Sequence, residues 1–163
     1  MNSLISVFFQ LLCDGFFAAV AAIGFSSISN PPRQAFSYCA MLAAIGHMLR
    51  LLLTMANIHI IFASLVGATS IGILAVMCAP RIKCPPETLS FPALLPMIPG
   101  MYAYRTVQGL VLCLVHKEEE SFDHFLYLFS YNGFTCTFIV IAMVIGVTIP
   151  IFVFKNISFS ATK

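Results

Sequence analysis

Long apolar stretches, separated by short polar connections, dominate the chain. Most are about 20 residues or longer, which is the length that a helix needs to cross the hydrocarbon core of a bilayer. The pattern therefore predicts an all-α, polytopic integral membrane protein whose single transmembrane domain covers residues 1–163. We expect five membrane segments, at about residues 3–24, 34–55, 60–79, 91–115 and 125–154.

The fourth segment differs from the others because prolines interrupt it. It contains three prolines, Pro92, Pro96 and Pro99, and Gly100 comes directly after the last of them. An interior proline removes a helical hydrogen bond. In lipid the freed backbone groups need other partners, so a broken helix persists only inside protein or beside a wet cavity. We therefore predict a break around Pro96 to Gly100 that lines a transport path, and the segment either crosses fully or is re-entrant.

The composition excludes a soluble protein. Hydrophobic residues make up 60% of the chain and charged residues 9%, with a mean hydropathy of +0.99. Soluble domains carry about 25% charged residues, so this chain has too few charges to cover a water-exposed surface. Disordered chains combine low hydrophobicity with high net charge, and this chain has neither property. The net charge of +2 forms no basic stripe, so we expect a lipid bilayer and no nucleic acid as partner.

No arrangement of residues points to catalysis. The sequence contains no Ser/His/Asp or HExxH pattern and no glycine-rich phosphate loop, so we expect neither an enzyme nor a cofactor. Six cysteines lack CxxC or metal-ligand spacing and lie mostly in apolar runs, where cysteine behaves as a small hydrophobe. The first segment carries Asp14 and no basic n-region, so we interpret it as a retained membrane helix rather than a signal peptide.

The distribution of basic residues predicts the orientation in the membrane. With five crossings, one side receives five Lys or Arg residues from loops and termini, and the other receives Lys117 and, near a helix end, Arg50. The positive side faces the cytoplasm, so we expect the N-terminus outside and the C-terminus inside. The five residues on the cytoplasmic side are Arg33, Arg81, Lys83, Lys155 and Lys163.

Four ionisable residues within the membrane segments are functional candidates. Asp14 and Arg105 lie about half-way along the first and fourth segments, and His47 and Arg50 share a face of the second. A charge at the bilayer centre costs about 2.5–3.5 kcal/mol on insertion scales. The alternatives are a structural Asp14–Arg105 ion pair, a packing role for His47 and an Arg50 side chain that reaches the interface.

The expected break also indicates the kind of solute. A helix that restarts at Gly100 would point its free N–H groups and positive dipole end into the protein. Transporters place such half-helix ends at anionic substrate groups, and Arg105 would lie on the second turn. Because a guanidinium binds a carboxylate bidentately, we expect Arg105 to contact a small carboxylate and Asp14 to be the coupled acid.

Several motifs make the chain similar to a known family. These are Ala22-Ile23-Gly24-Phe25, Asn30-Pro31-Pro32-Arg33, Gly46-His47 with Arg50, and the stretch from Leu94 through Pro96, Pro99 and Gly100 to Tyr104. Together they resemble the threonine/serine exporter (ThrE) family over most of the chain, and the length matches its short form. The P-x-x-P-G-x-x-A-Y and G-H-x-x-R patterns are the most specific. One departure is Ser26, where the family pattern has Ala after Gly-Phe.

The resemblance implies a function and a partner. In the family this module is the C-terminal half of a full-length exporter, and the short form works with a larger membrane subunit. That pair is associated with succinate export across the bacterial inner (plasma) membrane, whereas fused members export threonine and serine. Two rival hypotheses are a homo-oligomeric amino-acid exporter and a non-transporting membrane scaffold. On the main hypothesis, Pro96, Pro99, Gly100 and Tyr104 line the transport path with the four ionisable residues.

Overall fold

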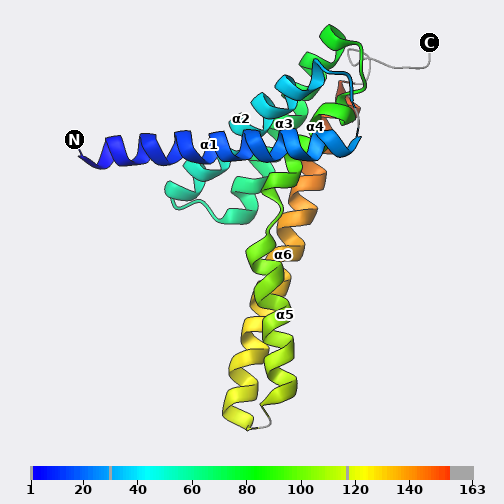
Figure 1. Cartoon of the computed structure of the whole chain (residues 1–163). Helices are drawn as coiled ribbons and strands as arrows, with labels where there is room; N and C mark the ends of the chain where they lie inside the picture. The colour runs from blue at the N-terminus through cyan, green and yellow to red at the C-terminus, as the bar shows by residue number, and fades with distance from the viewer. Residues whose placement is uncertain (1, 30, 117, 155–163) are drawn as a thin grey trace. The chain divides into compact units, whose positions relative to one another are not determined.

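The computed structural model describes residues 2–29, 31–116 and 118–154. Of the described residues, 89% are helical and none forms a strand, which confirms the predicted all-α class. Lys117, Lys155 and Lys163, which entered the orientation argument, lie outside the described residues. The elements are α1 (Asn2–Ser29), α2 (Ala35–Met55), α3 (Ile60–Ile82), α4 (Pro86–Leu94), the 3-10 helix η1 (Leu95–Met97), α5 (Gly100–Val115) and α6 (Glu119–Val153) (Figure 1).

Four helices are long and apolar enough to cross a membrane. They correspond to the first, second, third and fifth predicted segments, and α2 agrees with its prediction to within one residue. Helix α6 is 35 residues long, so it exceeds a perpendicular crossing, as expected for the fifth segment. The four spans are Ile5–Ile28, Ala35–Met55, Ile60–Ile82 and Glu119–Val153.

The fourth predicted segment is discontinuous, as the prolines predicted. It consists of α4, η1 and α5, and Ile98 and Pro99 separate the last two. Helix α4 starts at Pro86, inside the connection that we expected to be a polar loop, because a proline at the first helical position gives up no hydrogen bond. Helix α5 restarts at Gly100.

The chain divides into two compact units. The first contains the residues up to Met97 and those from Ala142 onward, and the second contains residues 98–141. In the first unit, glycines let α3 and the end of α6 touch through their backbones. A Cβ on Gly72 would lie 2.7 Å from the Val147 carbonyl oxygen, and a Cβ on Gly146 would lie 2.7 Å from that of Leu65. Larger side chains at these positions would force the helices apart.

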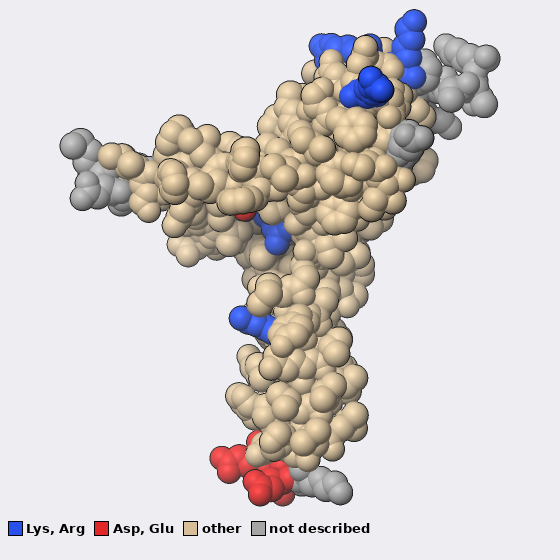
Figure 2. Space-filling view, viewed as in Figure 1, with Lys and Arg blue, Asp and Glu red and all other residues tan. Residues whose placement is uncertain are grey.

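The second unit is a hairpin in which α5 runs beside the first part of α6 (Figure 1). A Cβ on Gly109 would lie 2.8 Å from the backbone nitrogen of Phe129, so these helices also approach closely. Acidic side chains gather at the tip of the hairpin, where α6 begins within the run of glutamates (Figure 2). In the first unit, Lys and Arg side chains gather at one end (Figure 2). Elsewhere large exposed side chains are mostly apolar, as a lipid-facing surface requires.

Candidate functional site

Glycines bring three helices of the first unit together around the candidate residues. Gly15 on α1 faces Met48 on α2, whose sulfur would lie 2.5 Å from an added Cβ. On the other side of α2, a Cβ on Gly46 would lie 2.5 Å from the side chain of Ile71 on α3. An added Cβ on Gly67 would lie 2.9 Å from the Gly46 carbonyl oxygen. These close approaches position the side chains on either side of each glycine.

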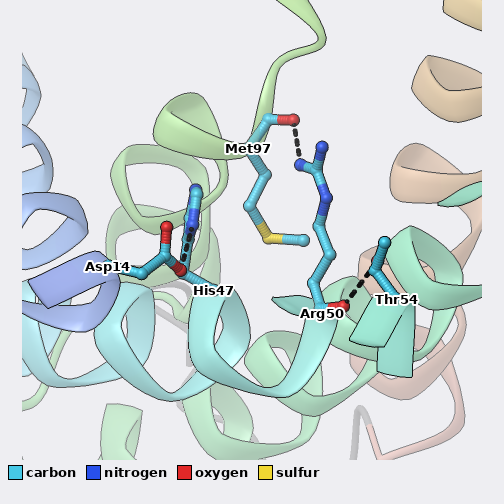
Figure 3. Close-up of polar contacts among 5 residues, drawn as sticks. All are labelled: Asp14, His47, Arg50, Thr54 and Met97. Carbon is cyan, nitrogen blue, oxygen red and sulfur yellow. Dashed lines mark hydrogen bonds and ion pairs between the residues drawn. The ribbon is translucent and has the colours of Figure 1, made fainter. Parts of the chain in front are cut away.

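Asp14 and His47 form an ion-pair contact between α1 and α2. His47 Nδ1 lies 3.0 Å from Asp14 Oδ2 (Figure 3), so an N–H at Nδ1 would donate to the carboxylate. The His47 side chain is 19% exposed and that of Asp14 31%. The other ring nitrogen, Nε2, is buried and has no hydrogen-bond partner among the described residues. A buried polar atom without a partner calls for an explanation, and a solute or water is a natural one.

Arg50, one turn further along α2, contacts the broken segment. Its Nη1 donates a 2.6 Å hydrogen bond to the carbonyl oxygen of Met97, the last residue of η1 (Figure 3). In a continuous helix this carbonyl would accept from a backbone N–H one turn ahead. The break removes that donor, and a carbonyl without a partner at membrane depth is costly. The guanidinium therefore stabilises the end of η1.

A pocket connects these two contacts. Its volume is about 170 Å³, and a water needs about 10–15 Å³ on this measure, so it has room for several waters or one small solute. A carboxylate, an imidazole and a guanidinium meet there on otherwise apolar helices. The pocket is lined by Asp14, His47, Arg50, Leu51, Thr54 and Ile60.

Comparison with known proteins identifies the family. The sequence profile described as "Threonine/Serine exporter, ThrE" matches residues 14–153, from the aspartate of the pocket to the end of α6. The chain belongs to the threonine/serine exporter family. The pocket therefore lies in the matched region of an exporter-family membrane protein. No solved structure matches the chain.

A relative from Haemophilus influenzae is much longer than this exporter-family chain. The two are 37% identical over 142 residues, which are 86% of this chain and 46% of the relative. That protein carries only the name "Uncharacterized protein". The chain thus spans about half the length of the relative that it matches.

The structure divides the residues predicted for the transport path between the two units. Asp14, His47 and Arg50 come together at the pocket, and Pro96 lies in η1 of the same unit. The remaining predicted residues belong to the second unit, where the side chain of Tyr104 is 62% exposed and Arg105 is also exposed. The Asp14–Arg105 pair considered above thus stays a prediction. These second-unit residues are Pro99, Gly100, Tyr104 and Arg105.

Sequence reasoning missed two parts of this exporter-family site. Thr54 follows Arg50 by four residues and His47 by seven, so helical spacing alone places it on their face. This spacing could have identified Thr54 from the sequence. The Met97 carbonyl had no such signal, because every residue has a carbonyl and only the fold shows which one lacks a helical partner.

Proposed function

We propose that the chain is the small membrane subunit of a two-component exporter of a small carboxylate, with succinate as the solute. It would act in the bacterial inner membrane with a larger membrane protein of the same family. The observation that carries this proposal is the pocket of the first unit, in which a carboxylate, an imidazole and a guanidinium meet on apolar helices of an exporter-family chain. The larger partner would contribute the other membrane half of the transport path.

The charged residues support a carboxylate solute. Arg50 lines a pocket of solute size, and Arg105 is the one arginine or lysine among the described residues of the second unit. Guanidinium groups match carboxylates in shape and charge. Arginines within apolar helices suit an anionic solute that must leave water to cross the membrane.

Reconstitution of the pair tests the proposal. The partner to co-express is a protein of the same organism that resembles the part of the Haemophilus influenzae relative not covered here. We expect the two chains to co-purify, and succinate efflux from preloaded cells to require both. If the chain alone, purified and placed in liposomes, exports threonine or serine, it is instead a self-sufficient amino-acid exporter.

A second comparison separates transport from scaffolding. If Asp14, His47, Arg50 and Arg105 are all neutralised and efflux by the pair remains at the wild-type rate, the chain only stabilises its partner. Loss of efflux with an intact, co-purifying pair supports a direct role in transport.

A further inference from the structure

Arg50 belongs to two features of the first unit at once. It holds the Met97 carbonyl at the end of η1, and it lines the pocket that contains the Asp14–His47 pair. An anion that enters the pocket therefore meets a guanidinium that is already bound to a backbone carbonyl. A carboxylate brings a full negative charge and two oxygens, so it is a stronger and potentially bidentate acceptor for arginine.

The Asp14–His47 contact places further polar atoms in the same pocket. Asp14 Oδ2 lies 3.0 Å from His47 Nδ1, and both residues line the pocket together with Arg50. The unpartnered Nε2 of the same ring lies buried at the site and suits a second polar group on the solute.

We propose that this pocket is the carboxylate-binding site of the transporter, in which Arg50 exchanges the Met97 carbonyl for a solute carboxylate and His47 Nε2 meets a second polar group of the solute. The proposal rests on the proposed function for the identity of the solute, but the site itself is defined by the four groups of the first unit. Binding of the solute would leave the Met97 carbonyl without its donor, so occupancy of the pocket loosens the end of η1.

Protection of a cysteine in the pocket tests the site directly. Thr54 lines the pocket and is exposed, so Thr54→Cys, in a chain lacking the six native cysteines, gives a reporter for a neutral thiol reagent. Thr137→Cys, an exposed position on α6 outside the pocket, is the matched control. In opened membranes containing the full chain and its partner, succinate should slow labelling at position 54 and not at 137. Butane-1,4-diol, which lacks the carboxylates, should protect neither.

Arginine variants test the anchor. Arg50→Lys keeps the charge but loses the bidentate fork. We therefore expect the half-protecting succinate concentration to rise about ten-fold, which corresponds to about 1.4 kcal/mol. Arg81 also donates to a backbone carbonyl, that of Met77, but lies outside the pocket, so Arg81→Lys should leave protection unchanged.

The outcomes separate the site from the proposed function. If threonine or serine protects position 54 and succinate does not, the site stands and the solute of the proposed function is wrong. If the pair exports succinate but no carboxylate protects position 54, the function stands and the site is wrong. If neither protection nor export is observed, the proposed site is also wrong. This outcome is measured with the Thr54→Cys reporter, so it stands even if the Arg50 variant does not fold.

Discussion

His47 on α2 holds Asp14 on α1 through a 3.0 Å contact between Nδ1 and Oδ2. These two residues are the partly buried members of an ion pair in a chain that has few charges. Gly15, beside Asp14, and Gly46, beside His47, allow the helices to approach closely on either face of α2. The pair therefore follows from helix packing as much as from charge, and it places a titratable group in the pocket.

Neutralising Asp14 should separate solute binding from proton dependence. We expect Asp14→Asn to keep solute binding, because the arginines remain, and to abolish the pH dependence of export, because an amide cannot take up and release the coupled proton. Efflux should be measured over a range of external pH. Asp123→Asn, an exposed acid of the second unit, is the control. An unchanged pH profile in Asp14→Asn would show that the pair does not couple protons to transport.

A methyl group at Gly67 should destabilise the first unit. Its Cβ would lie 2.9 Å from the Gly46 carbonyl oxygen and 2.9 Å from Met97 Cε, so α2 and α3 must move apart beside Arg50. Overpacking of this kind costs about 1–3 kcal/mol. We expect Gly67→Ala to lower the melting temperature in detergent. Gly24→Ala has no atom within 4 Å of the new Cβ and should melt like the wild type, and equal melting of the two variants would contradict the close approach.

Much of the fold could be predicted because membrane helices appear in the sequence as long apolar runs. Apolar length placed α2 almost to the residue, and the run Pro96 to Gly100 marked the break before α5. The ends of helices were less predictable. Helix α3 continues through Pro80 to Ile82, and α6 begins among the glutamates at Glu119. Polar residues can extend a helix into water, and acidic residues favour its first turn, so hydropathy alone places these boundaries too close to the apolar run.

The candidate site was predictable only in part. Sequence identified Asp14, His47 and Arg50 individually, because ionisable residues in apolar segments are rare and costly. It did not pair the aspartate with the histidine, since 33 positions separate them and only packing of α1 on α2 brings them together. Helical spacing relates residues on one helix, not on two.

Cysteine labelling should establish the orientation. Cys84, in the connection between α3 and α4, is a poor probe because it is 3% exposed and burial, with Cys39 nearby, raises the pKa of its thiol. Glu87, in contrast, is exposed. In a chain without the native cysteines, Glu87→Cys should react with an impermeant reagent only after permeabilisation, and Ala56→Cys, in the α2–α3 turn, in intact cells. The reverse pattern would place the N-terminus in the cytoplasm.

Arg105 provides the sharpest comparison with Arg50. It is exposed on α5, and the sequence predicts that it contacts the solute. A charged group on an apolar helix needs a partner, and a carboxylate solute would supply one. Arg105→Lys should therefore weaken binding, because the charge remains but the planar fork is lost, and Arg105→Ala should weaken it further. Arg33 is an exposed arginine before α2. Arg33→Lys is the control, because it makes the same arginine-to-lysine change outside the predicted solute contact. Wild-type affinity and export rate in both Arg105 variants would assign this arginine a structural role and leave Arg50 as the anchor for the carboxylate.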